Sequence, residues 1–140
     1  MQKVVVTGGA GFIGSHIADA LLAKGYAVTV IDDFKTGNRA NIAHLDGKIE
    51  FIEGSILNEG LLHQALSGAT YVFHQAAIPS VPKSVKDPLA SHEANATGTL
   101  KVLLAAREEK VKRVIYAASS SVYGDTPTLP KHEGMPPNPL

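Results

Sequence analysis

The chain has 140 residues, of which 44% are hydrophobic, and its 13 basic and 13 acidic residues cancel to a formal net charge of +0. This length predicts one domain that folds without a metal or a disulfide. The balanced charge gives no field for nucleic acid or an anionic membrane, and zero cysteines exclude a disulfide scaffold, a thiolate nucleophile and a zinc-thiolate site. With no long apolar span and no basic leader, we expect a cytoplasmic protein.

Strand-like and helix-like runs alternate along the chain. Strands are expected near residues 2–7, 27–32, 49–53, 70–74 and 112–118, helices near 12–24, 58–66 and 88–109, and a short helix over 38–45. Pro88 suits the first turn of the long helix, and Gly25 suits the end of the first helix. The pattern predicts an α/β fold, a doubly wound parallel sheet of order 3-2-1-4-5 with helices on both faces.

A glycine-rich segment, TGGAGFIG at residues 7–14, lies between the first strand and the first helix. Gly8 allows a sharp turn, Gly11 leaves room for a phosphate, and Gly14 lets the helix approach the sheet. The helix N-terminus then directs N–H groups and its positive dipole end at an anion. An isolated match of this kind is often an ordinary turn, but the flanking strand and helix favour a dinucleotide site of the Rossmann type.

Two acidic residues, Asp32 and Asp33, end the second strand about 20 residues after the glycines, where a carboxylate can accept the hydroxyls of an adenine ribose. A negative charge there favours NAD over NADP, whose 2′-phosphate it would repel. Lys35 and Arg39 lie just downstream and are able to attract such a phosphate, so NADP is disfavoured without being excluded. The alternative is that the two acids only open a polar turn.

Three further segments are expected at the carboxyl ends of the strands. Residues 74–77 (HQAA) would let a flat backbone run along the cofactor, or form a simple small-residue turn. Residues 119–121 (SSS) place hydroxyls near a substrate oxygen, or act as turn formers. Asn95 is either an exposed polar residue or an internal hydrogen-bonding post. The histidines form no pair at metal-ligand spacing, and His74 is expected to pack at a strand end.

Together these motifs resemble the extended short-chain dehydrogenase/reductases, and among them the nucleotide-sugar epimerases and dehydratases. The likeness covers the whole chain and rests on TGGAGFIGSH (7–16), HQAA (74–77), NATGT (95–99) and SSSVYGD (119–125). It implies NAD contacts from Gly8, Gly11, Phe12, Ile13, Gly14, Asp32, Asp33, Thr36, Gly37, Ser55, Ile56, Gln75, Ala76, Ala77 and Asn95. It implies substrate contacts from Ser80, Ser119, Ser120 and Ser121, of which Ser119 and Ser121 carry the catalytic hydroxyls.

The resemblance also narrows the reaction. The sugar 4,6-dehydratases have an Asp-Glu pair where this chain has Ser120 and Ser121, which cannot relay a proton as carboxyls do, so elimination of water is disfavoured. The run from Gln75 to Ser84 is most similar to 4-epimerases acting on UDP-glucose or UDP-N-acetylglucosamine. One departure is Ser55, which stands where the family usually has an aspartate that contacts the adenine.

A second departure is that no tyrosine is followed four residues later by lysine, the pair that the family's chemistry needs. We therefore expect residues 1–124 to be an NAD-binding Rossmann domain and 125–140 a proline-rich loop at a truncation, with the C-terminal substrate half absent. This fragment is expected to be inactive alone, to bind NAD weakly and to risk self-association, whereas the full-length protein would be a homodimer that takes a UDP-sugar. The alternatives are a related dehydrogenase, reductase or decarboxylase, or a dinucleotide-binding module without chemistry.

Overall fold

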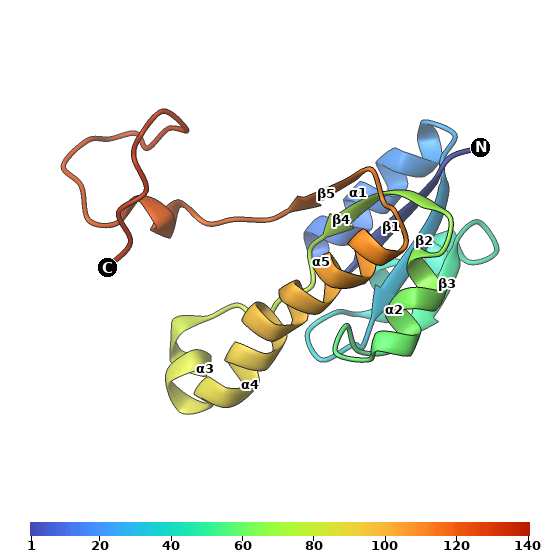
Figure 1. Cartoon of the computed structure of the whole chain (residues 1–140), viewed down its shortest axis with the longest axis horizontal. Coiled ribbons are helices and arrows are strands. Elements are labelled where there is room, and N and C mark those ends of the chain that lie inside the picture. The colour runs from blue at the N-terminus through green and yellow to red at the C-terminus, as the bar shows by residue number, and fades with distance from the viewer.

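All residues from 1 to 140 are described by the structure, a computed structural model that contains one five-stranded sheet (Figure 1). Its strands are β1 (Lys3–Thr7), β2 (Ala27–Asp32), β3 (Glu50–Glu53), β4 (Ala69–His74) and β5 (Arg113–Tyr116). All four neighbouring pairs are parallel, in the order β3-β2-β1-β4-β5. The strand order predicted from the sequence is confirmed, and it places the switch point between β1 and β4.

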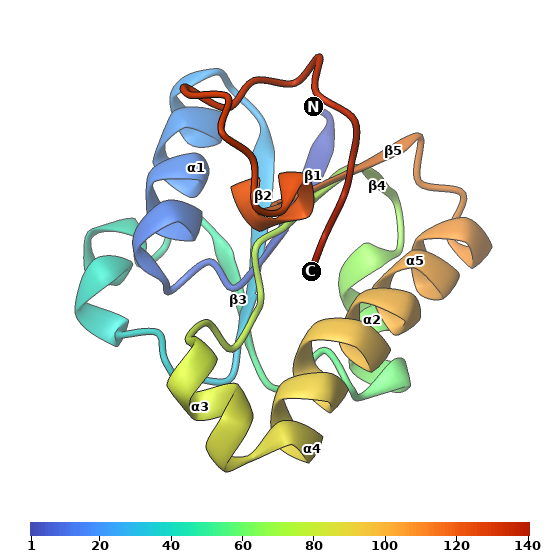
Figure 2. The ribbon, with the colours of Figure 1, turned by 90° about the vertical axis from the view of Figure 1, so that its left-hand side faces the viewer.

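Helices cover both faces of the sheet. They are α1 (Phe12–Ala23), α2 (Glu59–Leu66), α3 (Val81–Lys86), α4 (Pro88–His92) and α5 (Gly98–Glu108). Figure 2 shows α1 on one side of the sheet and α2 with α5 on the other. The fold is therefore the predicted Rossmann-type arrangement of layers.

The central strand β1 is buried on both of its faces. Val4 and Val6 belong to one core cluster, which contains Ala18 and Leu21 of α1, whereas Val5 belongs to the other, packed under α2 and α5. All three valines have no exposed surface. A continuous β-branched run is what a parallel strand between two helix layers requires.

The segment over 38–45 differs from the short helix expected there. It forms two separate 3-10 turns, Arg39–Asn41 and Ala43–Leu45. The Asn38 backbone N–H and the Asn41 side-chain amide both donate to Ala10 O, at 3.0 and 2.8 Å. These two bonds hold the segment against the glycine-rich loop.

The long helix expected over 88–109 is divided by a π-helical turn. The helix α4 is followed by a wide turn over Glu93–Thr97, in which Gly98 N–H bonds to Glu93 O, and α5 continues from there. A further helix, α3, was not expected from the sequence. Its start is marked by Ser80, whose hydroxyl accepts from Lys83 N–H at 3.4 Å, and by a proline in the first turn.

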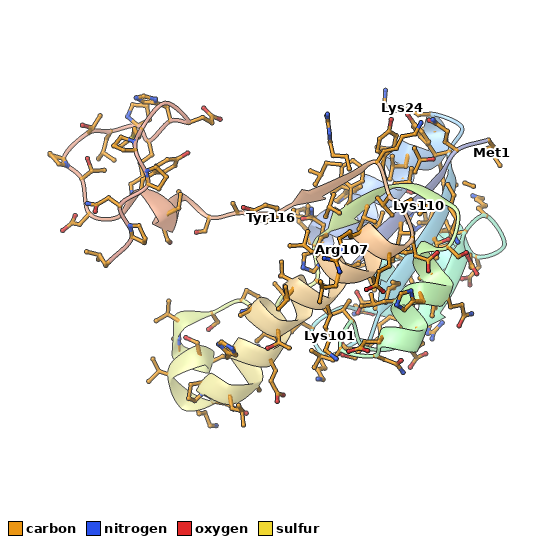
Figure 3. The ribbon with its side chains drawn as sticks, in the orientation of Figure 1. Met1, Lys24, Lys101, Arg107, Lys110 and Tyr116 are labelled. Atoms are coloured by element: carbon orange, nitrogen blue, oxygen red, sulfur yellow. The ribbon has the colours of Figure 1, made fainter.

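After β5 the chain leaves the sheet as an extension, residues 117–140. Strand β5 ends at Tyr116, two residues before the predicted end, and Figure 3 shows Tyr116 where the extension departs from the rest of the molecule. Ala117 N–H donates to His74 O at 3.2 Å, and every later hydrogen bond of the extension is internal to it. No residue of the extension is buried.

Apolar side chains are exposed beside this edge of the sheet. Leu100 and Leu103 on α5 are 56% and 45% exposed, and Tyr116 is 61% exposed. On the α1 side, a hollow of about 510 Å³ lies between Ile17, Phe73 and Ile115. Apolar surface is thus exposed on both sides of this edge, and the self-association expected from the sequence stays a prediction. None of the helices combines the length and the apolar character that crossing a membrane requires.

Candidate functional site

A pocket of about 90 Å³ opens at the carboxyl ends of the strands. It is bounded by the segments that follow β1, β2, β3 and β4, together with α4 and the π-helical turn. The predicted cofactor residues among its lining are Gly8, Asp32, Asp33, Thr36, Ser55, Ile56, Ala76 and Ala77. Residues that lie far apart in the chain therefore meet where a doubly wound sheet binds its ligand.

The glycine-rich loop fits closely against the segment after β4. Gly8 has φ +68°, and a Cβ there would lie 2.7 Å from Ala76 Cα. A Cβ at Gly14 would overlap the carbonyl oxygen of Gly8 and lie 2.8 Å from Gly9 Cα. The glycines thus have the predicted structural roles, a turn at Gly8 and a close helix approach at Gly14.

The N-terminus of α1 fits an anion. Its first residue follows Gly11, no side chain caps it, and its first turn contains no acidic residue. Phe12 and Ile13 at this end are 77% and 60% exposed. The positive end of this 12-residue helix is therefore left without a side-chain cap, four residues after Gly8, which lines the pocket. Such an end can donate N–H groups to a pyrophosphate.

Asp32 is 8% exposed, and backbone N–H groups hold its carboxylate. Its Oδ2 accepts from Ala10 N–H at 2.9 Å, and its Oδ1 accepts from Phe34 N–H at 2.8 Å. One carboxylate therefore joins the glycine-rich loop to the turn after β2. Each oxygen keeps a second lone pair, so the carboxylate retains acceptor capacity for a ribose hydroxyl at the pocket wall.

Both cations near this end of the pocket are paired with acidic side chains. Lys35 Nζ lies 3.6 Å from Asp33 Oδ2. Arg39 Nη2 donates to Glu53 Oε2 at 3.0 Å, and the Arg39 guanidinium lies 4.9 Å from the centre of the Phe34 ring. The pairing of these two cations supports the preference for NAD over NADP that the acids imply. The contacts of Arg39 were not expected from the sequence.

Asn95, in the π-helical turn, holds the segment after β4. Its Oδ1 accepts from Ile78 N–H at 2.8 Å, and its Nδ2 donates to Ile78 O at 3.0 Å. The side chain is exposed and also bonded within the chain, so it combines both interpretations offered by the sequence. Asn95 does not line the pocket, whereas Ile78 does, so Asn95 shapes the wall from behind.

His74 is packed at the end of β4, as predicted, with 5% of its surface exposed. Burial lowers the pKa of its imidazole below the ordinary value. Its ring nitrogens contact two hydroxyls, with Nδ1 2.7 Å from Thr7 Oγ1 and Nε2 2.9 Å from Thr99 Oγ1. Sequence reasoning missed both threonines.

The remaining predicted residues lie outside the pocket. Gly37 packs against the Asp32 carboxylate, and Gln75 N–H donates to Thr7 O at 3.0 Å. Ser80 caps α3. Ser119, Ser120 and Ser121 lie in the extension, where Ser119 Oγ donates to Ser121 Oγ at 3.0 Å. The structure therefore brings eight of the fifteen predicted cofactor residues to the pocket, whereas Gly11, Phe12, Ile13 and Gly14 at the start of α1 and the predicted substrate and catalytic serines do not line it. No cluster of three or more histidine and carboxylate side chains is arranged to hold a metal ion.

The sequence is similar to UDP-sugar enzymes. It is 41% identical over 135 residues to a UDP-glucose 4-epimerase of Klebsiella pneumoniae, covering 92% of this chain and 97% of that sequence. It is 38% identical to a putative UDP-glucose 4-epimerase of Methanocaldococcus jannaschii, covering 98% of this chain but 45% of the relative. A UDP-N-acetyl-alpha-D-glucosaminuronate decarboxylase of Bacillus cytotoxicus is 40% identical over 88% of this chain and 38% of its own length. The chain thus spans less than half of two of these relatives.

Solved structures of UDP-sugar 4-epimerases also superpose closely on this chain. The UDP-glucose 4-epimerase from Brucella ovis in complex with NAD superposes with a TM-score of 0.89 and 37% identity, covering 100% of this chain and 42% of that one. The UDP-N-acetylglucosamine 4-epimerase from Methanobrevibacter ruminantium gives a TM-score of 0.89 and 39% identity, covering 99% and 44%. The sequence pattern of the NAD dependent epimerase/dehydratase family matches residues 4–140. The chain belongs to the NAD dependent epimerase/dehydratase family.

Proposed function

We propose that this chain is the NAD-binding part of a nucleotide-sugar 4-epimerase acting on a UDP-sugar. The observation that carries the proposal is the pocket at the carboxyl ends of β1, β2 and β4, which Gly8 and Asp32 line, together with the uncapped N-terminus of α1, which begins four residues after Gly8. A dinucleotide needs both, since its ribose hydroxyls donate to a carboxylate and its pyrophosphate requires N–H donors. The epimerases among the relatives support the choice of reaction.

The residues of this chain would bind and orient the cofactor. Asp32 would accept from the adenine ribose, the first turn of α1 would donate to the pyrophosphate, and Ile56 would pack against the adenine. When bound, NAD would take a hydride from C4 of the sugar and return it to the opposite face, so that the reaction is redox neutral overall. Ser119 and Ser121 would hold the sugar oxygen at C4 while a base removes its proton.

The base itself is expected to come from a tyrosine-lysine pair, which this sequence does not contain. We therefore propose that the chain alone interconverts no UDP-sugars, because a positioned base typically contributes about 10²- to 10⁴-fold to such a reaction. We also propose that a longer form of the protein is a homodimer and that the extension meets the substrate only there.

A second candidate is a UDP-sugar decarboxylase, supported by the Bacillus cytotoxicus relative, which is 40% identical over 123 residues. The two reactions would share the oxidation at C4. The decarboxylase would then release the sugar's carboxyl group as CO₂ before the hydride returns, whereas the epimerase would return the hydride directly to the opposite face. A form of the protein that includes the second half would distinguish them. Release of CO₂ from a UDP-uronic acid would support the decarboxylase, and interconversion of UDP-glucose with UDP-galactose the epimerase.

Calorimetric titration with NAD and with NADP tests the binding proposal. We expect saturable binding that prefers NAD and is weakened at least about tenfold in Asp32→Ala, because the variant removes a buried carboxylate. Asp46→Ala is the control, which should leave NAD affinity unchanged, since Asp46 is an exposed acid outside the pocket. A folded chain that binds neither dinucleotide would contradict the proposal.

A further inference from the structure

A closed ring of hydrogen bonds lies directly behind the pocket wall. Thr7 and His74 are register partners on β1 and β4, so their side chains lie next to each other on the sheet face that α5 covers. Thr99 projects from the first turn of α5 to the other ring nitrogen of His74. Thr99 bonds to Asn95, whose Oδ1 accepts from Ile78 N–H. The backbone then runs back from Ile78 to Ala76, whose N–H donates to Thr7 Oγ1 and closes the ring.

The direction of each bond in the ring follows from its two ends. The Thr99 hydroxyl donates to Asn95 O at 2.6 Å, so its oxygen is left to accept from His74 Nε2–H. With its proton on Nε2, a neutral imidazole has an acceptor at Nδ1, which takes the proton of the Thr7 hydroxyl. The Thr7 oxygen in turn accepts from Ala76 N–H at 3.2 Å. Only a neutral His74 with Nε2 protonated satisfies all of these groups at once.

The ring fixes the backbone that faces the pocket. Ala76 and Ile78 both line it, and each is held at one end of the ring, Ala76 by Thr7 and Ile78 by Asn95. Ala76 also lies against Gly8, where there is no room for a Cβ. A displacement of residues 76–78 would therefore change the space between this segment and the glycine-rich loop, where the dinucleotide is proposed to lie.

We propose that His74 is a positioning residue for the dinucleotide: by joining Thr7 to Thr99 it sets the distance between the segment 76–78 and the glycine-rich loop. The inference rests on the proposed binding of NAD at this pocket. His74 touches neither the pocket nor the reacting atoms, and it acts through the backbone of Ala76 and Ile78. Losing one hydroxyl of the ring leaves a buried donor or acceptor without a partner, and the segment shifts to satisfy it.

The test compares NAD affinity in variants that keep or remove one hydroxyl. Thr99→Val removes the hydroxyl with little change in shape, and we expect it to weaken NAD binding about 5- to 10-fold, whereas Thr99→Ser restores most of the affinity. Thr97→Val is the matched control, because Thr97 lies in the same helical run and its hydroxyl makes no hydrogen bond. Binding is measured well below the melting temperature of each variant, so that loss of folded protein is not counted as loss of affinity.

Several outcomes overturn the inference. One is a Thr99→Val chain that melts at lower temperature but binds NAD as tightly as the original chain, which would make the ring structural only. Imidazole ¹⁵N chemical shifts of His74 in the unaltered chain provide a measurement that requires no variant to fold. A neutral ring with Nε2 protonated at pH 7 supports the inference, and protonation on Nδ1 contradicts it. If the unaltered chain does not bind NAD, the proposed function fails, and the ¹⁵N shifts still decide whether the ring exists.

Discussion

Residues 1–116 and residues 117–140 differ in how their positions are fixed. In the first region, side chains join segments far apart in the sequence: Asp32 bonds to Ala10 N–H, and Asn95 makes two bonds to Ile78. In the second region, the Ser119 side chain bonds only to Ser121, and the extension is held to itself, with Asn138 N–H donating to Val122 O at 2.8 Å. Figure 1 shows the extension projecting away from the sheet.

The predicted cofactor residues and the predicted catalytic serines therefore depend on different parts of the structure. The cofactor residues are fixed by the parallel sheet itself, since the carboxyl ends of neighbouring strands must meet at one edge. The serines follow β5, an edge strand with a neighbour on one side only, and no bond to the sheet holds the chain after Ala117. The pocket is therefore formed by residues of the first region while the predicted catalytic segment lies outside it.

The largest expected effect is in the first region, at Gly14. Gly14→Ala would place a methyl group against the carbonyl oxygen of Gly8, so α1 would have to move away from the sheet. We expect a loss of about 2–4 kcal/mol in the free energy of unfolding, with loss of NAD binding. Gly60→Ala is the matched control, because a Cβ there would lie 3.5 Å from Asn58 Oδ1, an ordinary contact. Urea denaturation measures the free energy of unfolding of both variants, and calorimetry measures their NAD binding. A Gly14→Ala chain that is as stable as the original and binds NAD would contradict this role of Gly14.

The next effect is a pH dependence of opposite sign at two histidines of the first region. Burial lowers the pKa of His74 below its ordinary value of 6.5, so the unfolded chain binds this proton more readily. A hydrogen bond from His63 to Glu109, at 2.9 Å, raises the pKa of His63 above 6.5, so the folded chain binds that proton more readily. The contribution of His74 to stability therefore falls as the pH drops below 6.5, and that of His63 falls as the pH rises through its folded pKa.

Unfolding free energies of the original chain, His74→Gln and His63→Gln between about pH 5 and 8 check these signs. The difference in unfolding free energy between the original chain and His74→Gln should become smaller as the pH falls. The difference between the original chain and His63→Gln should become smaller as the pH rises. Differences that change in the same direction would show that one of the two environments is wrongly described.

The smallest expected effect is removal of residues 119–140. Because none of these residues is buried, the free energy of unfolding should change by less than about 0.5 kcal/mol, and NAD affinity should stay the same. Thermal denaturation and calorimetry of the shortened chain measure the two quantities. A large loss of stability would mean that the extension packs on the first region in solution.

Much of the first region could be predicted because it depends on local patterns. The runs around Val5 and Ile31 are β-branched and continuous, and alternation with helices limits the topology to few choices. The position of Asp32 follows from its place at the end of β2. The helix α3 was not predicted, although Ser80 and Pro82 are both signals for a helix start.

The ring behind the pocket could not be predicted in the same way. Thr7 and His74 become neighbours only through the register of β1 with β4, and Thr99 reaches His74 only because α5 packs on that face of the sheet. The contact of Arg39 with Glu53 likewise joins a 3-10 turn to the end of β3. Each is a contact between side chains of different elements, which propensity and spacing do not encode.

A two-dimensional ¹H–¹⁵N NMR titration of the unaltered chain with NAD tests the central claim most directly, because it observes both regions in one experiment. We predict saturable shifts in the amides of Gly8, Asp33, Ser55, Ala76 and Ile78, and unchanged amides across 119–125. Shifts centred on residues 119–125, or a spectrum of a folded chain that NAD leaves unchanged, would contradict the proposal that NAD binds at the pocket formed by residues 1–116.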